Sequence, residues 1–243
     1  IMEIAEEHDL LVIEDACQAH GATIDRKHVG SIGHVAAFSF YATKNMMTGE
    51  GGIITTNDEE IIEAARSIKN HGRGVKGGYS HFRVGYNFRM MDLVSAIGLV
   101  QLKRLPKIVE RQRKNAAAFN KAFADIEELR PQKVLPGAES AYHVYAPRLY
   151  SESITRDEMI EYLRAHDVGA RSVYAVPCHK QGTYLNIGEW RWAKFVKYPD
   201  YASVSMPVAE EIGARHFQIP SHSQVTDEQV QKIIDTVLEA LRR

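Results

Sequence analysis

The stretch SFYATKNMMTGEGG (residues 39–52) places Lys44 after a short apolar run and before a pair of adjacent glycines. The run HVAAFSF (34–40) is typical of a buried strand, and the glycines permit a tight return into a further strand, GGIITT (51–56). Shielding from water disfavours the charged form of a lysine, which can then lose its proton and attack a carbonyl group. The alternative interpretation is an ordinary loop lysine.

The run LLVIEDA (residues 10–16) is apolar until it ends in two acids, Glu14 and Asp15. This pattern predicts a buried parallel strand with the acids at its C-terminal end. We expect helices before and after the strands, at residues 1–9 and 58–72. The alternation of helices and strands favours an α/β sheet that binds its ligands at the carboxyl ends of the strands.

The second half of the chain has a different pattern. We predict a loop at 73–86, and then a long helical stretch at 91–126 that breaks at Pro106 and is dense in charge beyond it. The helix therefore leads out of the first core into another. From about residue 130 the pattern indicates a smaller α+β domain, so we expect one domain at 1–118 and a second at 119–243.

Side chains that can cap helices mark three helix starts. Asn57 or Asp58 caps the helix that follows the third strand, and Thr155 caps a helix in the second domain. Thr226 together with Gln229 forms the capping-box pattern at the start of the last helix.

Composition narrows the class of protein. The chain has 243 residues, is 44% hydrophobic and carries a formal charge of −1, so no long-range field favours nucleic acid or a membrane surface. Cys17 and Cys178 fit no metal or redox spacing, which suggests a reducing compartment. Without a membrane-spanning run or a signal peptide, the cytoplasm is the expected location. The eleven histidines follow no ligand spacing, so we expect no metal.

An acid at a strand end and a shielded lysine can serve one cofactor together. Pyridoxal 5'-phosphate (PLP) has a ring nitrogen that an acid can keep protonated and an aldehyde that a lysine can capture as a Schiff base. For the neighbouring acids we favour other roles. Glu14 is expected to be hydrogen-bonded or exposed at the strand end rather than catalytic, and Glu50 is expected to be a turn residue.

Three blocks carry a resemblance to a known family. VIEDACQAHGA (12–22), SFYATKNMMTGEGG (39–52) and GYNFRMMDLVSAIGLVQLKRL (85–105) together resemble the DegT-type (DegT/DnrJ/StrS) PLP-dependent sugar aminotransferases. The resemblance implies a large α/β domain of the aspartate-aminotransferase type, here lacking its N-terminal part, and a small C-terminal α+β domain. It also implies a cytoplasmic homodimer with shared active sites. Its activity would transfer an amino group from an amino acid, with glutamate as the expected donor, to a nucleotide-linked keto-sugar.

The resemblance implies a role for five residues. Asp15 matches the acid that pairs with the pyridine nitrogen, and Gln18 matches a residue near the phenolic oxygen of the ring. Lys44 matches the Schiff-base lysine, which also moves protons during transamination. Ser39 corresponds to a hydroxyl that binds the cofactor phosphate. Asn87 corresponds to a residue that reaches the phosphate of the neighbouring subunit's cofactor.

The chain also departs from the family pattern. The helix at its start follows, in the family, a segment with a phosphate-binding loop and a residue that stacks on the ring, so we expect a truncated chain. An alternative is therefore an inactive remnant that acts as a binding or structural module. A related PLP-dependent sugar dehydratase is a third possibility, but those relatives carry histidine in place of Lys44.

Two further groups of residues have alternative interpretations. Arg73, Arg83 and Arg89 could clamp a nucleotide diphosphate, or they could form ordinary loop contacts, and Arg89 could have a structural role. The aromatic stretch at 184–201 could stack on a nucleotide base, but is more often a packing surface.

Overall fold

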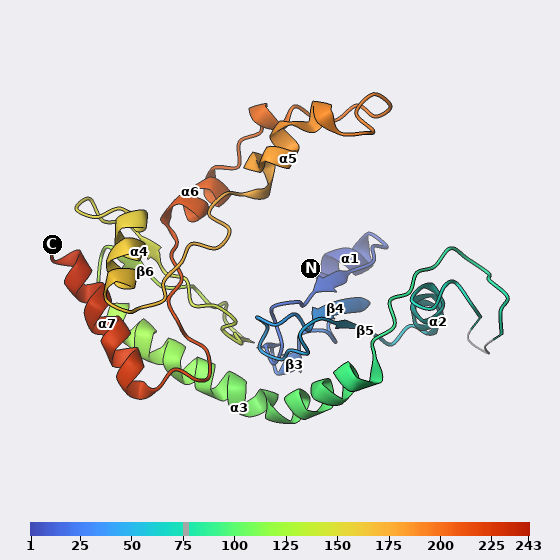
Figure 1. The fold of residues 1–243 in the computed structure, drawn as a ribbon, viewed down its shortest axis with the longest axis horizontal. Helices are drawn as coiled ribbons and strands as arrows, with labels where there is room; N and C mark the ends of the chain where they lie inside the picture. The colour runs from blue at the N-terminus through green and yellow to red at the C-terminus, as the bar shows by residue number, and fades with distance from the viewer. Residues whose placement is uncertain (75–77) are drawn as a thin grey trace. The chain divides into compact units, whose positions relative to one another are not determined.

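The computed structural model (Figure 1) describes residues 1–74 and 78–243. These residues form two compact units. The first unit comprises residues 1–114 and 134–143, and the second comprises residues 115–133 and 144–243. Part of the predicted loop at 73–86, residues 75–77, lies outside the described residues. The predicted domain division after residue 118 stays a prediction.

The first unit is built on a three-stranded sheet in the order β1-β4-β5. Strand β1 (Ile13–Asp15) pairs in parallel with β4 (Val35–Ser39), and β4 pairs antiparallel with β5 (Gly52–Thr56). The short helix α1 (Met2–Glu7) precedes β1. Helix α2 (Glu59–Ile68) follows β5 and is capped by Asp58, which was one of the two predicted caps.

Strand β1 is less buried than its sequence suggests. The prediction of a parallel strand is confirmed, but Leu11 and Ile13 are 74% and 73% exposed, so the expected burial is wrong for this structure. Side chains project from the faces of a sheet, so this exposure means that the described residues leave the face largely uncovered at these positions. An apolar run indicates that a strand is suited to burial, but it does not show which residues cover the strand.

A second, smaller sheet extends the first unit. Its strands are β2 (Thr23–Ile24), β3 (Lys27–His28) and β7 (Ala138–Glu139), in the order β3-β2-β7 with antiparallel pairing. Arg113 lies 3.2 Å from Glu139 and donates to the Ser140 carbonyl, which ties this sheet to the long helix α3 (Asp92–Phe123).

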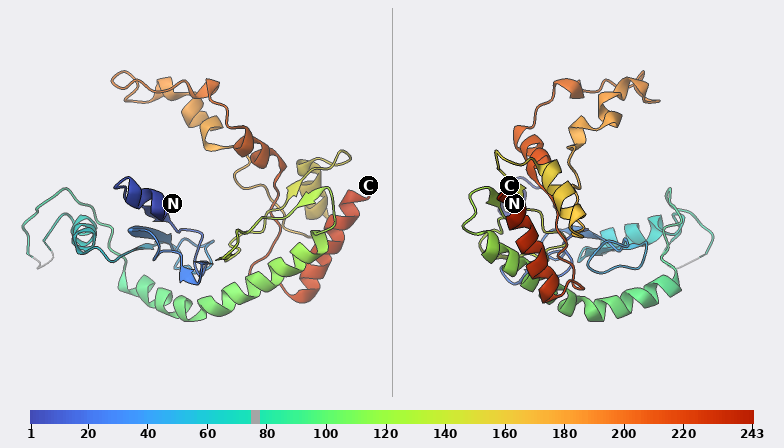
Figure 2. Two further views of the ribbon diagram at one scale, coloured as in Figure 1. Left: turned by 180° about the vertical axis from the view of Figure 1, so that it is seen from behind. Right: turned by 60° about the vertical axis from the view of Figure 1, so that its left-hand side comes forward.

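Helix α3 (Asp92–Phe123) passes through Pro106 without interruption, as Figures 1 and 2 show, so the predicted break is wrong. A proline removes one backbone donor and costs about 3 kcal/mol inside a helix. In this helix the buried residues Gly98 and Val109 lie on either side of the proline. Packing is extensive after the proline, where Val109, Ala116 and Phe119 are buried, and it offsets the local cost in a way that the sequence pattern does not reveal.

The second unit is a small α+β assembly around an aromatic core. Phe119 lies 5.0 Å from the ring of Tyr145, and the Tyr145 hydroxyl donates to Asn120. The cap predicted at Thr155 and the capping box predicted at Thr226 are both present, and Thr155 also forms a capping box with Glu158. Its elements are β6 (Leu129–Arg130), β8 (Arg148–Leu149), α4 (Arg156–Ala165), η1 (Cys178–Lys180), α5 (Gly182–Leu185), η2 (Ile187–Glu189), η3 (Tyr201–Ser203), α6 (Pro207–Arg215) and α7 (Asp227–Leu241).

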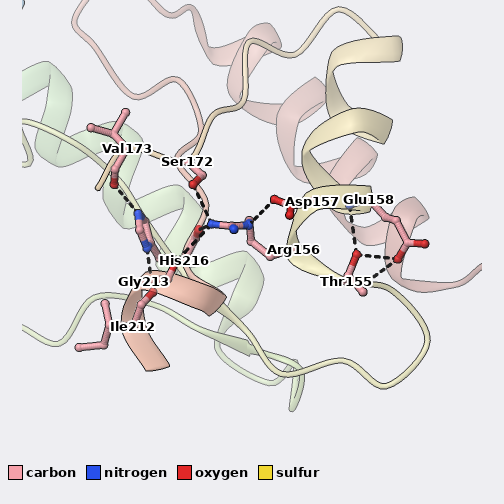
Figure 3. A network of polar contacts seen from close by, with 9 residues as sticks. All are labelled: Thr155, Arg156, Asp157, Glu158, Ser172, Val173, Ile212, Gly213 and His216. Atoms are coloured by element: carbon pink, nitrogen blue, oxygen red, sulfur yellow. Dashed lines mark hydrogen bonds and ion pairs between the residues drawn. The ribbon is translucent and has the colours of Figure 1, made fainter. Parts of the chain in front are cut away.

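A polar network joins α4 and α6 to the segment at 172–173 (Figure 3). The Arg156 guanidinium donates to the Ser172 hydroxyl at 2.7 Å and to the Gly213 carbonyl at 3.2 Å. The two ring nitrogens of His216 lie 2.7 Å and 2.5 Å from the carbonyl oxygens of Ile212 and Val173. Arg156 thus satisfies the Gly213 carbonyl, which would be costly to leave unpaired in the protein interior, and a neutral His216 ring can donate to one of its two carbonyl neighbours.

The aromatic stretch at 184–201 packs against itself. Tyr184 lies 5.9 Å from Trp190 and 5.1 Å from Tyr201, and Trp190 lies 5.4 Å from Tyr198. The Trp190 indole also donates to the Thr183 carbonyl. These contacts favour the packing interpretation of this stretch over base stacking. Within residues 1–74 and 78–243, no helix has the length and apolar character needed to cross a membrane.

Glu14 accepts three backbone hydrogen bonds, in agreement with the non-catalytic role expected for it. Its carboxylate oxygens lie 2.8 Å, 2.9 Å and 2.7 Å from the amide nitrogens of Gly30, Ile32 and Gly33. Burial alone would raise the pKa of Glu14, but these three donors together lower it below its ordinary value. The side chain thus holds the turn that leads into β4.

Replacing Glu14 by glutamine is expected to lower the free energy of unfolding by about 1–2 kcal/mol at neutral pH, because the amide cannot accept all three bonds. Since folding lowers the pKa of Glu14, its stabilising effect is present above the ordinary glutamate pKa of about 4.3 and is lost as the pH falls. Urea titrations at several pH values measure this difference. Glu63→Gln, on the exposed side of α2, is the matched control. An equal loss at pH 3 and pH 7 would contradict the assignment.

Candidate functional site

The parallel pairing of β1 with β4 brings the candidate residues to one edge of the sheet. Asp15 is the last residue of β1 and lies opposite Ala37, two residues before the end of β4 at Ser39. Because the two strands run in the same direction, their carboxyl ends meet at the same edge. The loop that carries Lys44 begins directly after β4.

Asp15 is an exposed, ionised carboxylate. Its pKa lies below the ordinary aspartate value, first because of the Cys17 side chain beside it and then because of the Cys17 backbone N–H, which donates at 3.1 Å. The Cys17 thiol itself donates to the Ala37 carbonyl at 3.6 Å. The positive charge of Lys44 lowers the pKa of Asp15 further. A carboxylate that stays ionised at neutral pH can pair with a protonated ring nitrogen.

Lys44 is half-buried, and its amine makes no hydrogen bond within the described residues. Its backbone N–H donates to the Tyr41 carbonyl at 2.9 Å, which makes a tight turn after β4. The charge of Lys44 acts on Asp15, on Cys17 and on His20, so the amine lies within electrostatic reach of all three. The structure therefore brings Lys44 and Asp15 together.

Ser39 lies between the strand and the turn. Its hydroxyl oxygen accepts from the Tyr41 backbone N–H at 3.2 Å and is only partly buried. The hydroxyl can still donate a hydrogen bond to an anion at this edge.

Gln18 and Asn87 are placed less directly. Gln18 is exposed in the turn after β1. Asn87 is exposed and forms a β-bridge with Asn70 after α2, and within the described residues it has no hydrogen bond with Asp15 or Lys44. Their predicted contacts with the cofactor stay predictions, and the contact predicted for Asn87 requires a second subunit.

His20 is a residue near the site that the sequence analysis did not select. Its ring is 4% exposed and lies 5.2 Å from Phe38 and 6.0 Å from Phe40. Burial, and then the charge of Lys44, lower the pKa of His20, so the ring is neutral near pH 7. In the sequence, the small residues on either side of His20, an alanine and a glycine, were the feature that could have indicated its burial.

The arginines of the loop after α2 make local contacts. Arg89 donates to the Asn70 side chain at 3.0 Å and lies 2.7 Å from a ring nitrogen of His71. Arg73 lies over the ring of Tyr79 at 4.6 Å. These contacts favour the structural interpretation of Arg89. In the described part of the chain, no three histidine, cysteine or acidic side chains gather in a way that could hold a metal ion.

The groups at this edge fit PLP in charge and in chemistry. The Asp15 carboxylate is a counter-charge for a protonated pyridine nitrogen, and the Lys44 amine is free to condense with an aldehyde. The Ser39 hydroxyl lies at the end of the adjacent strand. The arrangement therefore supports chemistry in which an amine attacks a carbonyl.

Alkylation of Cys17 reports on the charges of this site. The neighbouring Asp15 carboxylate, and then burial, raise the pKa of Cys17, and Lys44 opposes the rise. A raised pKa means less thiolate, so Cys17 should react with iodoacetamide more slowly than the exposed Cys178 at pH 8. Asp15→Asn should speed the labelling of Cys17 several-fold, and Lys44→Gln should slow it. Peptide mass spectrometry measures both rates, with Cys178 as the internal reference.

Unchanged Cys17 rates in both variants would contradict the placement of Asp15 and Lys44 next to this thiol. The two variants are expected to act in opposite directions, so a general loosening of the chain, which speeds both, is distinguishable from a change in charge.

The chain is similar to known aminotransferases in sequence and in fold. A profile of the DegT/DnrJ/EryC1/StrS aminotransferase family matches residues 1–238. GDP-perosamine synthase of Caulobacter vibrioides is 32% identical over 244 residues, covering 99% of this chain and 62% of that protein. The crystal structure of DesV from S. venezuelae in complex with a ketimine intermediate is 30% identical, with a TM-score of 0.87, and covers 100% of this chain and 61% of DesV.

A third similar structure is GDP-4-keto-6-deoxy-D-mannose-3-dehydratase of E. coli with bound hydrated PLP. It is 25% identical, has a TM-score of 0.80, and covers 97% of this chain and 62% of that enzyme. The chain spans about three fifths of the length of the curated relatives it matches. The structural likeness confirms the predicted α/β fold class of the aspartate-aminotransferase type. With its profile match over nearly all residues, the chain belongs to the DegT/DnrJ/EryC1/StrS aminotransferase family.

Proposed function

We propose that this protein acts in a PLP-dependent aminotransferase that moves an amino group from an amino acid to a nucleotide-linked keto-sugar. The observation that carries the proposal is the meeting of an ionised carboxylate, Asp15, and an unbonded amine, Lys44, at one edge of the sheet. Neither group alone would distinguish the site from an ordinary loop. Together they provide the two groups that PLP chemistry requires.

Asp15 has an electrostatic role in this proposal. Bound PLP supplies an aldehyde that condenses with amines and a protonated ring that accepts an electron pair. Asp15 keeps the ring nitrogen protonated, because a carboxylate with a lowered pKa remains charged and favours a positive partner. Without that charge, removal of a proton from the α-carbon of the amino acid would be slower.

Lys44 has two roles. Its Nζ would hold PLP through the aldehyde carbon, with loss of water. When the amino acid occupies that carbon instead, the Lys44 amine would take the proton from the α-carbon of the amino acid and give it up again. The neighbouring His20, neutral and buried, leaves this proton transfer to Lys44.

The other predicted residues complete the proposal. Ser39 binds the cofactor phosphate and Gln18 lies near the phenolic oxygen of the ring. Asn87 reaches the phosphate in a second subunit, so the enzyme would be a homodimer with shared sites. The name GDP-perosamine synthase supports a nucleotide-linked sugar as the acceptor. Glutamate is the proposed donor, and the two free cysteines suit a cytoplasmic location.

Addition of PLP tests the proposal. The protein should develop an absorption band in the visible region as Lys44 bonds to the aldehyde, and Lys44→Ala and Lys44→Arg should both abolish it. Lys44→Arg keeps the positive charge, so it separates the loss of the amine from the loss of charge. Lys27→Ala, at an exposed position in β3, is the control that should keep the band.

Asp15→Asn should keep the band but slow the transfer of the amino group by about tenfold or more, because the ring nitrogen loses its counter-charge. The rate at which glutamate is converted to its keto acid measures this transfer. A band that survives in Lys44→Ala would overturn the proposal, as would wild-type kinetics in Asp15→Asn.

A further inference from the structure

The position of Lys44 depends on more than its own contacts. Its backbone makes one hydrogen bond to the turn, and its amine makes none within the described residues. A lysine has four rotatable side-chain bonds, so an unanchored loop would let the amine sample many positions. Some other residue must therefore hold the backbone on which this side chain stands.

The next residue, Asn45, is buried where a loop asparagine is ordinarily exposed. It is 7% exposed, and both ends of its amide are engaged. The nitrogen donates to the Ala141 carbonyl at 3.1 Å. The oxygen accepts from the Gln112 amide at 3.0 Å and lies 3.4 Å from a ring nitrogen of His143.

These contacts join three segments that are far apart in the sequence. The Lys44 loop is tied to α3 through Gln112, and to the residues after β7 through Ala141 and His143, all within the first unit. The loop closes on its other side through Thr48, whose backbone N–H donates to the Phe40 carbonyl at 2.8 Å. Met46, between the two anchors, is also buried.

We propose that Asn45 is a positioning residue, which holds the backbone of Lys44 so that the amine faces the edge of the sheet that carries Asp15. This inference rests on the proposed function of Lys44 and extends it to a residue that has no contact with substrate or cofactor. Asparagine suits the position because one side chain both donates and accepts. Aspartate would face the Ala141 carbonyl with a second acceptor, and leucine would leave Gln112 and Ala141 unpaired.

The test measures the chemical reactivity of the Lys44 amine in the protein without cofactor. Limited acetylation with acetic anhydride, followed by peptide mass spectrometry, gives the reactivity of Lys44 relative to the exposed Lys27 and Lys69. In Asn45→Leu the loosened loop should expose the amine, so the relative reactivity of Lys44 should rise several-fold. In the same variant, attachment of PLP at saturating concentration should slow several-fold, because the amine is no longer held in place.

Asn115→Leu is the matched control. Asn115, in α3, is a buried asparagine like Asn45, and its amide donates to the Ser221 and His222 carbonyls at 3.2 Å in the second unit. The Asn115→Leu substitution should lower the melting temperature about as much as Asn45→Leu does and leave the reactivity of Lys44 unchanged. Equal reactivity of Lys44 in wild type and Asn45→Leu, with lowered stability in both leucine variants, would show that Asn45 is merely structural and would overturn the proposal.

Gln112→Leu covers the case in which Asn45→Leu does not fold. It removes one of the bonds to Asn45 and keeps the bond to Ala141, so the reactivity of Lys44 should rise by a smaller factor. No rise in a folded Gln112→Leu would count against the proposal. Because acetylation involves no cofactor, failure of PLP to attach to wild type would refute the proposed function and leave the role of Asn45 to be decided separately.

Discussion

The parallel pairing of β1 with β4 is the constraint on which the site depends. Asp15 and Lys44 are 29 residues apart in sequence numbering and approach each other because both strands end at the same edge of the sheet. A slip of one residue in this register would turn Asp15 toward the opposite face. The register is in turn supported by Glu14, which ties β1 to the turn before β4 through three backbone donors.

In two pairs of adjacent residues, one side chain holds the fold in place and the other is available for chemistry. Glu14 is occupied by backbone hydrogen bonds, whereas the adjacent Asp15 keeps an exposed carboxylate. Both ends of the Asn45 amide are hydrogen-bonded, whereas the amine of the adjacent Lys44 makes no hydrogen bond to any residue in 1–74 or 78–243. In each pair, the anchored residue limits the movement of the backbone while its neighbour remains available to a ligand.

Much of the fold could be predicted from local patterns. The caps at Thr155 and Asp58 and the capping box at Thr226 could be predicted because they depend on residues three or fewer positions apart. The continuity of α3 through Pro106 could not be predicted, since it depends on how the rest of the helix packs. The exposure of Ile13 was missed for a similar reason, because burial depends on what packs against the face of the sheet.

The candidate site shows the same division. Asp15 and Lys44 could be selected from their chemistry and their motifs, but His20 and Asn45 could not, because their importance comes from contacts across the fold.

The most direct test of whether the Lys44 amine captures the PLP aldehyde is to incubate the protein with PLP, reduce it with borohydride and map the peptides. The expected result is a pyridoxyl group on Lys44. Label spread over exposed lysines, with Lys44 unmodified, would contradict it.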